Sequence, residues 1–408
     1  MKLAEARDLD QSDAFATKRA QFKLPEGVVY LDGNSLGALP RGVEEAVQQL
    51  VTNQWGKSLI RGWNEHDWID LPEKVASKLA PLLGTKAHCI SCGDSTSLNV
   101  FKTLAAALSL RPARKIILSD TGNFPTDLYM AQGLSQLLAQ GHELKTVAPE
   151  DVAEAIDESV AVLMLTQVDY RSGKLHPMAE LTQKAQAVGA LTLWDLAHSA
   201  GAFQVELDAC NADFAVGCGY KYLNGGPGAP AFCYVAERHH KALASPLSGW
   251  MGHAAPFAFD HEYQPAEGVR RLRVGTPPIL GLTALNRALD VYDGVDMQEL
   301  RKKALALCDL FIEEVQTRCP QVELVGSKNR SAYGSQVSFR HESGYAIVQA
   351  LIAEGVIGDF RAPNVMRFGF TPLYIGYEDT VKAAQTLQQV LEEELWRQPE
   401  YMTKAKVT

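Results

Sequence analysis

The chain has 408 residues, of which 46% are hydrophobic and 21% charged, and its formal net charge is −9. This composition is typical of a globular protein with a large core, and it excludes a low-complexity chain. The acidic balance argues against a nucleic-acid-binding surface, and no segment approaches the ~18 apolar residues of a membrane span. We therefore expect neither nucleic acid nor membrane among the partners.

The cysteines and the first residues indicate a reducing compartment. Seven cysteines in a long chain argue against a disulfide framework. Cys89 and Cys92 are the only close pair, and a zinc site needs about four ligands, so we predict no metal. Residues 1–5 lack the apolar stretch of a secretory signal, which predicts a cytoplasmic protein.

Short apolar runs alternate with helical patterns through the middle of the chain. This alternation predicts an α/β fold with a mostly parallel central sheet. Beyond residue 276 the pattern changes to that of a smaller α+β domain. The expected strands are 88–91, 115–119, 144–147, 160–166, 190–195, 213–217, 336–339 and 365–368, and the expected helices are 100–108, 126–138, 152–156, 178–188, 279–292, 297–318 and 378–395.

Three parts of the chain follow from these patterns. The prolines at 277 and 278 mark a boundary, because proline continues neither a helix nor a central strand. We predict a large domain at 51–276 and a small C-terminal domain at 277–408. Residues 1–50, with one short strand at 28–31 and a helix after Pro40, are expected to pack beside the small domain.

Two segments place reactive side chains after predicted strands. Lys221 lies in a turn rich in glycine and aromatic residues, where a lysine serves either as a Schiff-base amine or as a structural residue. Asp195 ends a buried strand, and His198 follows three residues later. A carboxylate there can pair with a protonated pyridine nitrogen, although a helix N-cap is an equally good interpretation.

Two further segments fit the same site. Thr96 and Ser97 stand at the predicted start of a helix, which is an anion site or an ordinary N-cap. Phe124 and Asp127 follow the strand at 115–119, where the aromatic ring stacks on a ligand or belongs to a turn. Because all four segments follow strands of one sheet, together they predict pyridoxal 5'-phosphate (PLP) bound to Lys221 as a Schiff base.

The chain resembles the aspartate-aminotransferase-like superfamily of PLP-dependent enzymes and, within it, the bacterial kynureninases. The resemblance spans residues 22 to the final helix and rests on several long strings. They are LDGNSLG at 31–37, LIRGWN at 59–64, FPTD at 124–127, WDLAHSAG at 194–201, YKYLNGGPG at 220–228, PLSGWMGH at 246–253, GTPPI at 275–279 and MRFGFTPL at 366–373.

The resemblance implies a large PLP-binding domain, a homodimer with shared active sites and a set of residue roles. Lys221 would carry the cofactor and move the Cα proton, and Tyr220 would be an acid–base group. Arg367 would hold the substrate α-carboxylate. The implied cofactor-binding residues are Thr96, Ser97, Phe124, Asp127, Ser172, Asp195, His198, Tyr220, Lys221, Trp250 and Thr276, the last of which would reach across the dimer interface together with Trp250.

The implied reaction is the hydrolysis of L-kynurenine to anthranilate and L-alanine in tryptophan catabolism. Trp63, Gly275 and Thr276 resemble the residues of bacterial members that prefer kynurenine, and 3-hydroxykynurenine is a further candidate substrate. Asp169 departs from the pattern, because related sequences can carry an amide there.

Three other functions fit the same fold. A cysteine desulfurase or selenocysteine lyase needs a reactive cysteine on a loop of the C-terminal half, whereas Cys308 and Cys319 fall in or at the end of a predicted helix. An aminotransferase shares the fold, which does not fix the reaction. A non-catalytic PLP-binding regulator would lack the substrate arginine that Arg367 supplies.

Overall fold

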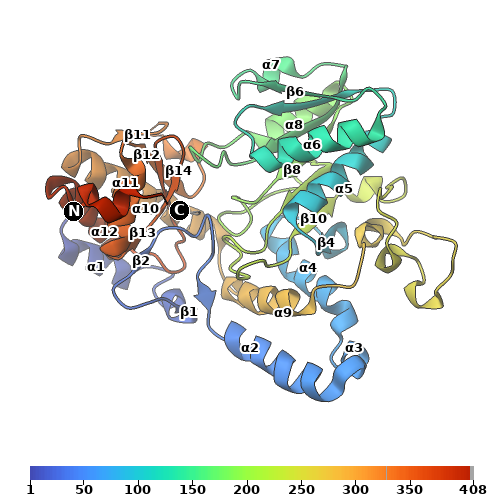
Figure 1. The fold of residues 1–408 in the computed structure, drawn as a ribbon, viewed down its shortest axis with the longest axis horizontal. Helices are drawn as coiled ribbons and strands as arrows, with labels where there is room; N and C mark the ends of the chain where they lie inside the picture. The colour runs from blue at the N-terminus through green and yellow to red at the C-terminus, as the bar shows by residue number, and fades with distance from the viewer. Residues whose placement is uncertain (328, 405–408) are drawn as a thin grey trace.

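The computed structural model describes residues 1–327 and 329–404. Figure 1 shows a larger lobe built around a seven-stranded sheet and a smaller lobe beside it, where both chain ends are marked. The functional side chains described below come from both lobes. Within the described residues, no helix is long and apolar enough to cross a membrane.

The large sheet has the strand order β4-β10-β9-β8-β7-β5-β6. Neighbours from β9 to β6 are parallel, whereas β10 is antiparallel to both of its neighbours. The predicted α/β fold with a mostly parallel sheet is therefore confirmed. The strands are β4 (Ile90–Cys92), β5 (Ile116–Asp120), β6 (Glu143–Val147), β7 (Val160–Thr166), β8 (Leu191–Asp195), β9 (Phe214–Gly217) and β10 (Phe232–Val235).

Helices cover both faces of this sheet, which explains why every residue of β7 is buried. Val162 and Met164 of β7 pack in one core cluster with α5 (Thr96–Ser109) and α6 (Pro125–Leu138). Leu163 and Leu165 face the other side. There they join a cluster that includes α4 (Leu71–Leu82) and α8 (Met178–Ala187), and the short helix α7 (Val152–Ala155) contributes to it as well.

The small lobe is an antiparallel sheet with helices. Its strand order is β11 (Glu323–Leu324), β12 (Gln336–Arg340), β15 (Val365–Gly369) and β14 (Asp359–Arg361). The long helix α10 (Met297–Arg318) coincides with its predicted bounds and packs against α12 (Tyr377–Glu392). Its other helices are α11 (Gly344–Ala353) and α13 (Pro399–Met402), whereas α9 (Ile279–Ala288) precedes the lobe in the chain.

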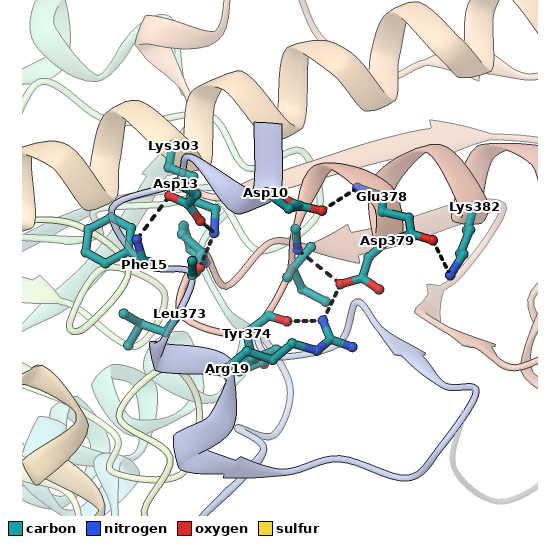
Figure 2. A pocket seen from close by; sticks show the side chains of 14 residues that line it. Asp10, Asp13, Phe15, Arg19, Lys303, Leu373, Tyr374, Glu378, Asp379 and Lys382 are labelled. Carbon is teal, nitrogen blue, oxygen red and sulfur yellow. Dashed lines mark hydrogen bonds and ion pairs between the residues drawn. The ribbon is translucent and has the colours of Figure 1, made fainter. Parts of the chain in front are cut away.

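The first forty residues attach to the small lobe. The strand β2 (Val29–Tyr30) pairs in parallel with β13 (Val356–Ile357), while β1 (Phe22–Lys23) pairs with β3 (Leu39–Pro40). Asp10, in α1 (Leu3–Gln11), accepts hydrogen bonds from the first backbone amides of α12 at 2.7 and 3.0 Å. Figure 2 shows this attachment, in which Arg19 pairs with Asp379 and Lys303 with Asp13 around a cavity of about 260 Å³.

The next helix belongs to the other lobe. α2 (Val43–Gln49) runs on as helical turns to Ser58 and packs against α9, and α3 (Gly62–Glu65) follows. The predicted boundary between residues 50 and 51 therefore falls inside a continuous helical segment. α9 itself lies after the proposed boundary at 276, yet it packs against α4 of the large lobe.

Candidate active site

Lys221 follows β9 at the edge of the sheet where the parallel strands end. Its side chain is half-buried, and Nζ lies 3.3 Å from Nε2 of His198. The same Nζ is 6.0 Å from the ring centre of Phe124 and 5.9 Å from that of Tyr220. These four side chains, predicted separately from sequence, therefore meet around one amine.

The backbone around Lys221 is held by the N-terminal segment. Gly37 donates a hydrogen bond to the Tyr220 carbonyl at 2.8 Å, and Asn224 donates one to the Lys221 carbonyl at 2.9 Å. A side chain at position 37 would place its Cβ only 2.3 Å from the Lys221 carbonyl oxygen. Only glycine permits this approach, which accounts for the last residue of the LDGNSLG string.

Two buried carboxyl groups face the amine. Asp195 ends β8, and its Oδ1 accepts the Ala197 amide at 2.7 Å. Asp127, in the first turn of α6, is hydrogen-bonded to Asp195. Burial and the Asp195 charge raise the pKa of Asp127 well above its usual value, so that Asp127 holds a proton and donates it. Burial also raises the pKa of Asp195, while Lys221 and the amide of Ala197 lower it.

Two other neighbours of Lys221, His198 and Tyr220, are uncharged at neutral pH. Burial, and then the positive charges of Lys221, Arg367 and Arg361, lower the pKa of His198 well below its usual value. Its imidazole therefore accepts the hydrogen bond from Lys221. Burial and the neighbouring Cys218 raise the pKa of Tyr220, which keeps its hydroxyl protonated.

The Phe124 ring is held at the rim of the site. It is 41% exposed and meets Tyr170 edge-on, with ring centres 5.3 Å apart at 89°. The turn before it is fixed by Asp120, whose Oδ1 accepts the Gly122 amide at 2.7 Å. His176 holds the other oxygen of Asp120 at 2.6 Å. One face of Phe124 is thus available to a flat ligand ring.

Arg367 comes from the small lobe and is 1% exposed. Its guanidinium is paired with both oxygens of Asp359, with Nε to Oδ1 at 2.6 Å. It also donates to the Tyr170 carbonyl at 2.5 Å and to the Ser35 hydroxyl at 3.0 Å. Because Tyr170 belongs to the large lobe, Arg367 joins the two lobes beside the lysine site.

Sequence reasoning missed the residues around Arg367. Asp32 and Ser35 belong to the LDGNSLG string at 31–37, in which no role was predicted for either residue. Asp359 and Arg361 lie in no motif of the sequence. We call these residues and Arg367 the arginine cluster. Ser35 donates to Asp359 at 2.5 Å, and Arg361 pairs with the same carboxylate at 2.8 Å.

Three of the predicted residues lie on the turns that follow β4 and β7. Thr96 and Ser97 form the first turn of α5, and Ser95 caps that helix by accepting the Leu98 amide at 3.3 Å. Ser172 donates its hydroxyl to Asp169 at 2.6 Å. The Asp169 carboxylate also accepts the amides of residues 171 and 172, so it stabilises the turn that follows β7.

Trp63, Gly275 and Thr276 line pockets that Lys221 does not, and Gly275 and Thr276 also border the Gly93–Asp94 turn before α5. Trp63 and Thr276 line one apolar pocket of about 380 Å³ together with Trp55, Trp68 and Leu280, and no residue of the lysine site lines it. Gly275 adjoins Thr276 on the exposed loop before α9. Trp250 is 42% exposed and packs edge-on against Phe257.

The donor set fits a flat heteroaromatic aldehyde with an anionic tail. An amine, an aromatic face and a charged carboxylate surround the same space. Segments adjoining it also hold four buried polar atoms without a partner among the described residues, whereas buried polar atoms are normally satisfied by a partner, water or ligand. They are Asn123 Oδ1, Asp127 Oδ2, Gln167 Oε1 and Ser199 Oγ.

Solved structures with the same architecture define the class of protein. The cysteine desulfurase CsdA of Escherichia coli matches with a TM-score of 0.77 and 20% identity, over 93% of this chain and 98% of that one. A C-DES mutant with glycine covalently linked to its PLP cofactor matches at 0.76 and 18%, over 90% and 98%. The fold is therefore the one that these enzymes share.

Sequence relatives narrow the class to one family. A model described as the kynureninase C-terminal domain matches residues 300–387. The kynureninase of Burkholderia mallei (strain SAVP1) is 48% identical over 411 residues, covering 99% of each chain. That of Deinococcus radiodurans is 51% identical over 400 residues, covering 96% of this chain and 97% of its own. The chain belongs to the kynureninase family.

Cys308 and Cys319, the two cysteines considered for a desulfurase, do not fit that role. Cys308 and Cys319 are both 0% exposed. Burial raises the pKa of each thiol to about 12, so neither forms the thiolate that attacks a sulfur atom.

Proposed function

We propose that the protein uses PLP on Lys221 to hydrolyse L-kynurenine to anthranilate and L-alanine in the cytoplasm, as a step of tryptophan catabolism, and that it accepts 3-hydroxykynurenine as a further substrate. The reaction is that of a hydrolase acting on a carbon–carbon bond of a ketone. The observation that carries the proposal is the half-buried Lys221 amine beside the Asp127–Asp195 acid pair, in a chain of the kynureninase family.

The side chains around Lys221 fit the parts of the cofactor. When bound, PLP withdraws electrons from the bonds at the substrate Cα and Cβ. Asp195 would hold the ring nitrogen with its negative charge, and the proton of Asp127 would keep a second charge from forming there. Phe124 would supply the stacking face, and Thr96 and Ser97 would hold the phosphate at the start of α5.

The reaction needs proton transfer at two places. Lys221, once its amine is free, takes the Cα proton. His198 beside it is uncharged, so it adds no positive charge that would oppose protonation of the amine. Water adds to the ketone carbon next to the ring. The Cβ–Cγ bond then breaks, its electron pair goes to Cβ, and that carbon takes a proton. The protonated hydroxyl of Tyr220 is our candidate acid near the carbonyl.

Arg367 is assigned to the substrate α-carboxylate because its permanent positive charge attracts a carboxylate. Asp359 holds its Nε and Nη2, so the substrate would approach from the side of Nη1. Arg367 is the buried cation whose charge reaches His198 at the lysine site. The aryl ring fits the apolar pocket of Trp63 and Thr276. Because no residue of the lysine site lines this pocket in one chain, we propose a homodimer in which the pocket of one protomer completes the lysine site of its partner.

The exposed apolar side chains beside this pocket support the homodimer. Leu59 is 61% exposed and Ile60 is 77% exposed, and Trp55 and Leu280, which line the pocket, are exposed as well. Several large apolar side chains exposed along one segment favour a surface that another protein covers.

Subunit mixing tests the shared site. Lys221→Ala and Trp63→Ala are each expected to inactivate the homodimer, while their heterodimer keeps one intact site made of Lys221 from one protomer and Trp63 from its partner. Random reassociation should restore about a quarter of the parent activity, since about half of the dimers are then mixed. A mixture that stays inactive places both residues in one protomer's own site and contradicts the proposal.

Anthranilate fluorescence tests the reaction. The purified protein with PLP should release anthranilate from L-kynurenine, and Lys221→Ala should release essentially none. Lys184→Ala, which removes an exposed lysine on α8, serves as the matched control and should keep the parent rate. A parallel assay with 3-hydroxykynurenine compares the two substrates. No anthranilate from the PLP-loaded parent would reject the proposal.

A further inference from the structure

The arginine cluster holds more acid groups than Arg367 needs as partners. Asp359 alone pairs with both nitrogens of the Arg367 fork and with Arg361. Asp32 makes no ion pair in the part of the chain that the structure describes, and its Oδ1 is buried without a hydrogen-bond partner. Burial and the charge of the neighbouring Asp359 instead raise the pKa of this carboxyl group.

The N-terminal segment is what brings this second acid into the cluster. β2 pairs with β13, and Asp32 then forms a bridge with Gly369 at the end of β15, two residues after Arg367. The Gly369 amide donates to the Leu31 carbonyl at 2.7 Å. Backbone pairing therefore fixes the Asp32 carboxyl beside Asp359.

We infer that Asp32 sets the charge with which the arginine cluster meets the α-carboxylate of the amino-acid substrate, and that the cluster binds this carboxylate well only while Asp32 keeps its proton. This inference deepens the proposed function and rests on it, because the role of Arg367 as the carboxylate site comes from there.

Charge counting gives the reason. The guanidinium groups of Arg361 and Arg367 face the carboxyl groups of Asp32 and Asp359. The net charge of these four groups is +1 while Asp32 is protonated and zero once Asp32 ionises. Burial and the Asp359 charge raise the pKa of Asp32 to about 8, against the opposing effects of Ser35 and Arg367. Asp359, held by Arg367, has a lowered pKa and stays ionised. Asp32 is therefore the acid of the pair that keeps the proton at neutral pH.

The other groups around Asp32 do not titrate in the same range. Burial raises the pKa of each tyrosine hydroxyl near it, so these stay protonated, and His198 is neutral because its pKa is lowered. A change of binding near pH 8 within this cluster is thus assigned to Asp32. The charged and titratable groups that act on it or feel its charge are Tyr30, Tyr222, Asp359, Arg361, Arg367 and Tyr374.

The experiment measures binding of L-alanine to the PLP-loaded enzyme by the change in cofactor absorbance between pH 6.5 and 9.5. Ethylamine, which has the amine but no carboxylate, is the reference ligand. In the parent, the ratio of the Kd for L-alanine to that for ethylamine should rise about tenfold from pH 7 to pH 9, as one group of pKa about 8 ionises.

Two variants test whether Asp32 causes the pH dependence of the ratio. Asp32→Asn should reduce the rise in the ratio to less than twofold, because the amide cannot ionise. Asp359→Asn removes the charge that keeps Asp32 protonated, so Asp32 ionises in its place and the net charge stays +1; L-alanine should bind at pH 7 as in the parent, and the rise in the ratio up to pH 9 should be lost. Circular dichroism and the cofactor spectrum of each variant verify its fold.

A flat ratio in the parent, or an undiminished tenfold rise in a folded Asp32→Asn variant, overturns the inference, and the parent measurement needs no variant to fold. The kynurenine assay is independent of it. If the parent shows the pH-dependent ratio yet releases no anthranilate, the role of Asp32 stands and only the proposed reaction fails.

Discussion

Replacing Asp127 by asparagine is expected to stabilise the cofactor-free protein increasingly as the pH rises. Asp127 is 2% exposed, and burial with the charge of Asp195 raises its pKa well above the usual value. From about pH 4 up to that raised pKa, the folded chain holds one proton more than the unfolded chain, so the free energy of unfolding falls with pH. One proton corresponds to a slope of about 1.4 kcal/mol per pH unit, which asparagine removes.

The assay is urea unfolding at pH 5, 6, 7 and 8, followed by tryptophan fluorescence. Trp194, fully buried in β8 beside Asp195, reports on the large lobe. The difference in unfolding free energy between Asp127→Asn and the parent should grow by about 1.4 kcal/mol per pH unit while the pH stays below the raised pKa of Asp127. Asp157→Asn is the control, because Ser159 lowers the pKa of this exposed carboxylate and its offset should not change over the range. A constant difference for Asp127→Asn would refute the protonated acid pair.

Two further substitutions test how the site is positioned. Arg367→Lys keeps the charge but loses the two-pronged pairing with Asp359, so the KM for L-kynurenine should rise at least about tenfold with little change in kcat; an unchanged KM in steady-state fluorescence would remove Arg367 from the carboxylate site. Gly37→Ala forces a Cβ against the Lys221 carbonyl and should weaken PLP binding at least about tenfold in an absorbance titration. Gly133→Ala, whose added Cβ meets nothing within 4 Å, should bind PLP like the parent. Equal binding by both variants would contradict the role of Gly37 in holding the backbone at Lys221.

Local pattern predicted the elements that carry the lysine site. The apolar run at 160–166 forms β7, and the run at 190–195, which ends in Asp195, forms β8. Both were predictable because a strand buried on both faces is apolar along nearly its whole length. Lys221, Asp195 and Phe124 then met because the ends of parallel strands share one edge of the sheet. This part of the site needed only the order of elements along the chain.

The arginine cluster was beyond the reach of the same reasoning. Its residues come from positions 32–35, 359–361 and 367, and they meet only through the β2–β13 pairing and the Asp32–Gly369 bridge. Neither two-residue strand has a periodicity that predicts its partner. The pairing of Asp127 with Asp195 was also missed, because a carboxylate in the first turn of a helix looks like a capping residue.

The two acid pairs solve the same electrostatic problem on either side of the substrate. Two carboxylates in contact cannot both stay charged in a buried site, so each pair retains one proton and presents a single negative charge. Asp195 directs that charge toward Lys221 and the cofactor, while Asp359 directs it toward Arg367. Asp127 and Asp32 are the proton-holding members, because burial and a neighbouring carboxylate raise the pKa of both, that of Asp32 to about 8. Rising pH should therefore weaken carboxylate binding as Asp32 ionises, and the KM for L-kynurenine should rise as the pH passes about 8.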